Sequence, residues 1–169
     1  MSTPTKYPRR MITLHWLVAV LVILGLMGGQ FFVSELKNDD PAKIGALMGH
    51  MIIGGTILVL MLARLIVRLR STVPPHANTA SMLAHWGLYA LIFTMAGSGI
   101  AMSLATGLPQ IVFFGQGTLP ATFNTLTARA VHGIAANALI ALVALHIAAA
   151  IWHAAVKKDG VMQRMSWRR

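Results

Sequence analysis

Residues 130–154 read AVHGIAANALIALVALHIAAAIWHA, an apolar run with three histidines and no Asp, Glu, Lys or Arg. At about 1.5 Å per residue, an α-helix of this length crosses the roughly 30 Å hydrocarbon core of a bilayer. Ionisable side chains are costly and rare in such helices, so those present are candidates for function. The run therefore predicts a membrane-spanning helix that carries part of a site.

Three further apolar runs, residues 11–33, 44–67 and 82–106, have the same character. The chain is 56% hydrophobic and 11% charged, whereas soluble domains carry about 25% charged residues. The first run follows basic residues but lacks a small-residue cleavage site, so we expect it to be retained. The sequence predicts an all-α, integral membrane four-helix bundle that forms one domain over residues 1–169.

The basic residues predict the orientation of the bundle. The net charge is +10, and Lys and Arg gather at one set of helix ends, leaving Lys37, Lys43 and Arg129 on the opposite side. Trp and Tyr residues cluster at the same ends, as in an interfacial aromatic belt. By the positive-inside rule, both termini are expected in the cytoplasm. This placement accounts for the charge without a nucleic-acid partner.

The chain has no cysteine, which excludes disulfides, zinc–thiolate sites, iron–sulfur clusters and covalent c-type haem. Of seven histidines, six lie within the four runs, which contain no Asp or Glu. Neutral imidazoles that share an interior favour metal or haem ligation. A histidine-lined metal or proton transporter is the competing interpretation, although such a path usually needs carboxylates or a broken helix.

His132 and His146 are 14 residues apart, only about 40° short of whole helical turns, and so share one face about 21 Å apart. This spacing suits two stacked haems with one ligand each. By depth, His50 matches His132, and His15 matches His146. Two other histidines, His85 and His153, lie at the same end as His146, so depth leaves the inner pair open.

Small residues and two arginines add to this hypothesis. Gly49 and Gly54 flank His50 and leave room for a flat macrocycle, although small residues also pack helices together. Gly29 has no histidine near it in the sequence and is expected to serve helix packing. Arg129 could hold a haem propionate, attract an anion or anchor the helix end. Arg64 could snorkel to the interface or hold an inner propionate.

The order and spacing of several motifs resemble those of the bacterial cytochrome b561 family of small di-haem membrane proteins. The matching stretches are Leu14-His15-Trp16, Gly49-His50-Met51, Arg64-Leu65-Ile66-Val67-Arg68-Leu69, Pro74-Pro75, Ala84-His85-Trp86-Gly87, Val131-His132-Gly133, Leu145-His146-Ile147-Ala148-Ala149-Ala150, His153 and Lys157-Lys158-Asp159.

The resemblance implies two non-covalent b-type haems, one for each pair of axial histidines. His15 and His146 would hold the cytoplasmic-side haem, and His50 and His132 the periplasmic-side haem. In the family's pattern, His85 and His153 then become, with Arg64, candidates for propionate or quinone contacts.

The resemblance also implies electron transfer in the bacterial inner membrane. In length and layout the chain is most similar to stand-alone superoxide:ubiquinone oxidoreductases, which would work among membrane lipids without a protein partner. In such members a basic residue is expected near the outer haem, and Arg129 occupies that place. The alternative is a cytochrome b subunit of a quinone-linked hydrogenase or dehydrogenase.

Overall fold

The computed structural model describes residues 6–76 and 78–167, and within these ranges all regular structure is helical. The helices, including two π-helical turns (η1 and η2) and a 3₁₀ turn (η3), are α1 (Arg9–Gly28), η1 (Gly29–Val33), α2 (Ala42–Arg70), α3 (Thr79–Thr106), α4 (Leu108–Phe114), α5 (Thr127–Trp152), η2 (His153–Lys157) and η3 (Met162–Met165). Four segments are long and apolar enough to cross a membrane, and they cover the four predicted runs: Arg9–Val33, Ala42–Arg70, Thr79–Thr106 and Thr127–Lys157.

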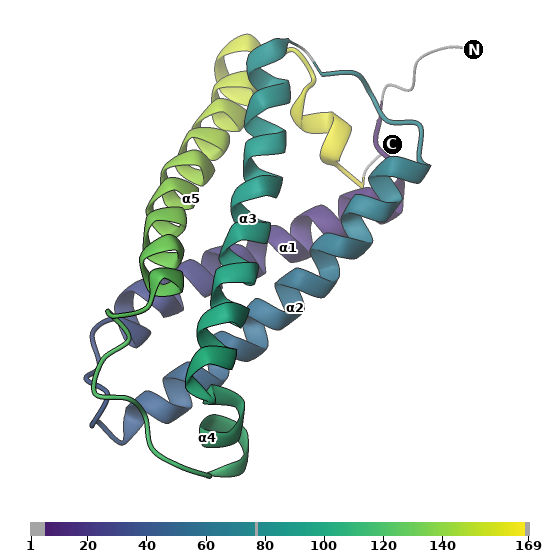
Figure 1. Cartoon of the computed structure of the whole chain (residues 1–169). Coiled ribbons are helices and arrows are strands. Elements are labelled where there is room, and N and C mark those ends of the chain that lie inside the picture. The colour runs from purple at the N-terminus through teal and green to yellow at the C-terminus, as the bar shows by residue number, and fades with distance from the viewer. Residues whose placement is uncertain (1–5, 77, 168–169) are drawn as a thin grey trace.

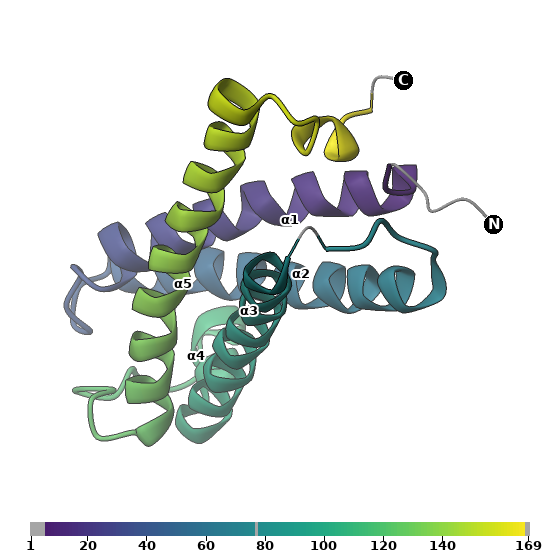
Figure 2. The ribbon, with the colours of Figure 1, turned by 90° about the horizontal axis from the view of Figure 1, so that it is seen from above.

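The four long helices form two pairs (Figure 1, Figure 2). α1 packs against α2, α3 packs against α5, and α2 joins the pairs through contacts with α3. At Gly87 on α3, a Cβ would lie 3.2 Å from the Leu142 side chain of α5, so glycine permits their close approach. A central apolar cluster fills the middle of the bundle, namely Val18, Val22, Ile57, Met61, Tyr89, Ile92 and Leu139. Many large apolar side chains remain exposed on the outside, as expected for a lipid-facing surface.

The bundle has two ends that we name by what they carry. At the terminal end, the backbone N–H of Tyr7 donates to the carbonyl of Arg164 at 3.2 Å, so both termini of the described chain lie together. The loop end carries residues 34–41, α4 and residues 115–126. α4 is a short helix between two glycines with positive φ, Gly107 and Gly115. Arg168 and Arg169 belong to the basic residues that the sequence assigns to the terminal end, and they lie outside the described residues.

The segment after α5 folds back over the start of α1. We call residues 159–167 the tail; Figure 2 shows it in yellow alongside α1. The Trp16 indole donates to the Met165 carbonyl at 3.0 Å, and the Trp167 indole donates to the Thr13 hydroxyl at 3.3 Å. At the base of the tail, His153 Nδ1 lies 2.6 Å from a carboxylate oxygen of Asp159. These contacts fasten the end of the chain to the first helix.

Replacing Asp159 with Ala should release the tail. The hydrogen bond from His153 holds the pKa of Asp159 below its ordinary value of 3.8. The contribution of this interaction to tail docking is therefore fully present above pH 3.8. It is lost as the pH falls through the lowered pKa of Asp159. We expect Asp159→Ala to speed tryptic cleavage at Lys157 and Lys158 several-fold at pH 7. The control Asp39→Ala, at the loop end, should cleave like the native chain.

In the native protein, tail docking should persist from pH 7 to about pH 4, as monitored by tryptophan fluorescence. Release of the native tail between pH 7 and pH 5 would contradict the assignment of the clamp to Asp159.

Candidate functional site

At the loop-end half of the bundle, His50 from α2 faces His132 from α5. Their ring centroids are 6.1 Å apart and their planes are inclined by 73°. The two residues come from different helix pairs, so the imidazoles bridge the space between those pairs. This is the combination that depth along the helices predicts.

At the terminal-end half, His15 from α1 faces His146 from α5, with ring centroids 6.3 Å apart and an interplanar angle of 67°. His85 from α3 lies 5.6 Å from the same His146 ring, so three imidazoles meet here. His153 is engaged by Asp159 at the base of the tail. The structure therefore keeps His85, but not His153, in contact with the predicted inner pair.

The spacing within each histidine pair fits a metal ion held between its two imidazoles. Two imidazoles bound to opposite sides of one ion, with metal–nitrogen bonds of about 2 Å, place their ring centres roughly 6 Å apart. The Nδ1 atom of His50 is buried without a hydrogen-bond partner, which is costly unless a bound group changes its surroundings. The described residues contain no group of three or more His, Cys, Asp or Glu able to hold a metal. A centre with two protein ligands takes its remaining ligands from elsewhere, and the macrocycle of a haem would supply four.

Two glycines form a cradle beside the outer pair. A Cβ at Gly29 would lie 3.2 Å from the His50 ring, and one at Gly99 would lie 3.4 Å from the His132 ring. Gly29 has no histidine near it in the sequence, but in the structure η1 places it against the ring of His50, 21 positions later, so its packing contact is with a candidate ligand. Around Gly49 and Gly54 a Cβ would meet nothing within 4 Å, so the surface of α2 is open there. The close contacts to both rings come from glycines on neighbouring helices.

Ser98 orients His132. Its hydroxyl donates to the Thr94 carbonyl at 2.7 Å and lies 3.0 Å from His132 Nδ1. A hydroxyl has one proton, so with that proton on Thr94 the oxygen accepts from an Nδ1–H of His132. The unprotonated Nε2 is then the atom that can bind a metal. Sequence reasoning missed Ser98; its signal is a serine between two glycines in an apolar run.

Arg64 reaches into the inner cluster rather than snorkelling outward. It lies almost two turns before the end of α2, with its guanidinium 5.0 Å above the Tyr89 ring. One terminal nitrogen is 3.5 Å from His15 Nδ1, while its buried Nε has no hydrogen-bond partner. The cation therefore lies beside the predicted inner ligands.

His76, the one histidine outside the four apolar runs, is half-buried rather than plain surface. Its Nε2 accepts from Arg68 at 2.9 Å, and its Nδ1 lies 3.3 Å from Nδ1 of His85. The loop before α3 thus adds a fourth imidazole to this cluster, in contact with His85. Nothing in the local sequence indicates this contact, because it depends on the turn between α2 and α3.

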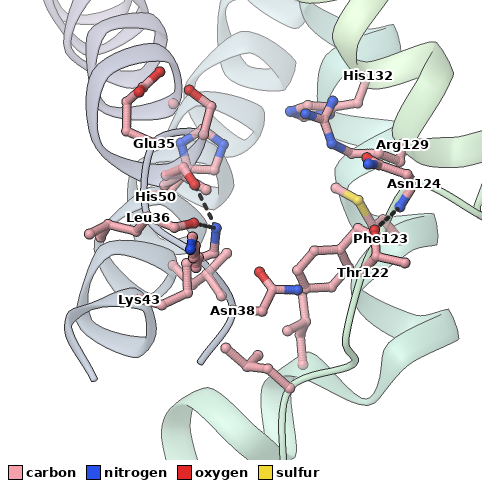
Figure 3. A pocket seen from close by; sticks show the side chains of 18 of the residues that line it. Glu35, Leu36, Asn38, Lys43, His50, Thr122, Phe123, Asn124, Arg129 and His132 are labelled. Carbon is pink, nitrogen blue, oxygen red and sulfur yellow. Dashed lines mark hydrogen bonds between the residues drawn. The ribbon is translucent and has the colours of Figure 1, made fainter. Parts of the chain in front are cut away.

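A pocket of about 1260 Å³ opens at the loop end, with the outer histidines among its lining residues. In Figure 3, His50 and Lys43 lie on one side, facing His132 and Arg129 on the other. Its volume exceeds the roughly 300–1,000 Å³ typical of small-ligand sites. The pocket therefore has room for a macrocycle and for a further small molecule beside it.

The charges of the pocket are separated by depth. Lys43 is only 5% exposed, and its ammonium donates to the carbonyls of Val33 and Leu36 at 2.6 and 2.8 Å. Among the described residues, neither Lys43 nor Arg129 has a carboxylate oxygen within 4.0 Å. Three acidic residues also line the pocket but are exposed or half-buried: Glu35, Asp39 and Asp40. Lys43 is thus a buried positive charge without a carboxylate partner. The sequence alone shows it only as one of three basic residues on this side of the bundle.

Comparison with known proteins agrees with this geometry. Residues 6–168 match the family described as prokaryotic cytochrome b561. The chain is 31% identical to a probable superoxide oxidase of Yersinia pestis, over 95% of both chains. It is 29% identical to cytochrome b562 of Cereibacter sphaeroides, over 98% of both chains. It is also 28% identical to cytochrome b561 homolog 2 of Escherichia coli, over 97% of this chain and 93% of that one.

The family match covers nearly the whole chain and includes all four membrane-spanning segments. The protein therefore belongs to the prokaryotic cytochrome b561 family, whose members bind b-type haem and transfer electrons.

Proposed function

We propose that the chain is a di-haem superoxide oxidase that passes electrons to ubiquinone. His50 and His132 would hold the outer haem, and His15 and His146 the inner one. One observation carries this proposal: two imidazoles face each other in each half of the bundle, and each facing set connects the two helix pairs. The ring centroids are 6.1 Å apart in the outer set and 6.3 Å apart in the inner set. The similarity to a probable superoxide oxidase supports the choice of substrate.

In this proposal the whole described chain forms one domain in the bacterial inner membrane, with the terminal end in the cytoplasm and the loop end in the periplasm. The excess of Lys and Arg at the terminal end supports this orientation. The pocket with Lys43 and Arg129 would then face the periplasm.

The overall reaction balances as two superoxide ions, one ubiquinone and two protons giving two dioxygen molecules and one ubiquinol. The bound haems supply one-electron transfer across the membrane. The protein orients the ligand rings, as Ser98 does for His132, and surrounds them with a low-dielectric interior.

Positive charge in the outer pocket supports an anionic substrate. Lys43 is buried and fixed by two carbonyls, and Arg129 lies one helical turn before His132. Fields of this kind raise the local concentration of an anion and its association rate. The exposed carboxylates at the rim are more strongly screened by water and salt.

At the inner site, Arg64 and His85 are the candidates for contact with a propionate or with the quinone. His153 is assigned instead to the base of the tail, because its Nδ1 is bound to Asp159.

The first prediction concerns haem stoichiometry. The purified protein should contain two b-type haems per chain by the pyridine haemochrome assay, and His132→Ala should retain one. The control His76→Ala should retain two, because that ring contacts Arg68 and His85 rather than either pair. A native protein without haem would refute the proposal and favour the transporter.

The second prediction concerns Arg129. Arg129→Ala should slow superoxide oxidation by about threefold to tenfold at low salt, because one unpaired positive charge near the substrate is lost. The dependence of the rate on ionic strength should also become weaker. Stopped-flow mixing with superoxide measures both, with Arg70→Ala at the opposite end as the control. Equal rates for Arg129→Ala and the native chain would remove Arg129 from the mechanism.

The same stopped-flow assay distinguishes this proposal from the alternative function, a cytochrome b subunit of a larger enzyme. A subunit of a hydrogenase or dehydrogenase needs its partner to deliver electrons, whereas a superoxide oxidase reduces ubiquinone as an isolated chain. Inactivity of the isolated di-haem protein with superoxide would favour the subunit.

A further inference from the structure

We infer that Tyr89 and Arg64 together form a buried carboxylate-binding site for a propionate of the inner haem. This inference rests on the proposed haem between His15 and His146. It assigns a role to Tyr89, which neither the family resemblance nor the histidine geometry singles out.

Tyr89 is a buried phenol with an unused donor. It is 5% exposed, and its buried hydroxyl has no acceptor for its O–H, because the neighbouring Arg64 guanidinium can only donate. Phe93 stacks on the same ring at a centroid distance of 6.5 Å, so a phenylalanine could provide the packing at position 89. Burying a hydroxyl that makes no hydrogen bond is unfavourable. The buried hydroxyl is therefore explained if a bound group accepts a hydrogen bond from it.

Arg64 is a second unsatisfied donor beside this ring. Its guanidinium lies 5.0 Å from the Tyr89 ring centroid, and its Nε is buried without a partner. Among the described residues it has no carboxylate oxygen within 4.0 Å. A charge in such surroundings needs a counter-charge, because isolated ions are poorly tolerated in a low-dielectric interior.

Haem binding would remove the contact that Arg64 makes with His15. Arg64 is only a donor, so at 3.5 Å the Nδ1 of His15 must act as the acceptor. When His15 binds a metal through Nε2, its proton lies on Nδ1 and that atom no longer accepts. The guanidinium then needs another acceptor at the moment when the haem brings two carboxylates.

A carboxylate suits these donors better than the carbonyl of a quinone. Guanidinium and carboxylate pair through parallel hydrogen bonds, and the negative charge offsets the buried positive one. A neutral carbonyl would accept from Tyr89 but leave the charge of Arg64 uncompensated. The propionate is the anion that the proposed haem delivers to this half of the bundle.

Isotope labelling of the haem carboxylates tests the inference. Cells grown on 5-aminolevulinate with a ¹³C carboxyl group make haem labelled at its propionates, so redox-difference infrared spectra of the holoprotein identify the propionate bands. Tyr89→Phe should shift a labelled band of one haem by removing its donor. It should also lower the equilibrium constant for reduction of that haem about fivefold, since the carboxylate becomes more negative.

Phe93→Leu is the control, because it disturbs the stacked ring without removing a donor. It should leave the labelled bands in place, while Arg64→Lys should shift the same band as Tyr89→Phe. Labelled bands that are identical in Tyr89→Phe and native protein would overturn the inference, as would a shift confined to an unlabelled quinone carbonyl band. If the protein contains no labelled haem, both the inference and the proposed function fail. If haem is present and these bands do not respond, only the inference fails.

Discussion

The cost of placing imidazoles in a hydrocarbon environment governs the rest of this structure. Each polar group within the bundle must find a partner there, because lipid offers none. Ser98 meets this need for Nδ1 of His132, but Nδ1 of His50 and the hydroxyl of Tyr89 remain without partners. These unsatisfied groups lie between or beside the two helix pairs. In the proposed function, groups bound between the two helix pairs complete this polar interior.

The broad architecture follows from the sequence because hydropathy and charge act over whole segments. Twenty or more apolar residues suffice to predict each span, and the clustering of Lys and Arg predicts that both termini share one end. The shared depth of His132 with His50, and of His146 with His15, also follows, since it depends on helix rise alone. These inferences need no knowledge of which helix packs beside which.

The details that sequence reasoning missed all depend on packing between helices. Gly29 was interpreted from its own helix, but its significance comes from the His50 ring that α2 places against it. His76 lies between two apolar runs, where the sequence gives no sign of a contact, but the turn before α3 directs its ring onto His85. Arg64 could equally have reached the membrane surface until the structure placed it over Tyr89. A single helix cannot reveal such contacts, because its neighbours decide which face is buried.

The two ends of the bundle use positive charge in physically different ways. Arg64 has a buried, unpaired Nε, so its field is little screened and acts over a few ångströms on whatever binds between His15 and His146. Arg129 lies half-buried at the edge of an open pocket, where mobile ions screen charge over about 8–10 Å. A screened field can attract a diffusing anion but contributes little to holding it, whereas an unscreened cation demands a permanent counter-charge. In the proposed function, the buried Nε of Arg64 therefore suits this residue to contact with the cofactor, and the open pocket around Arg129 suits that residue to substrate encounter.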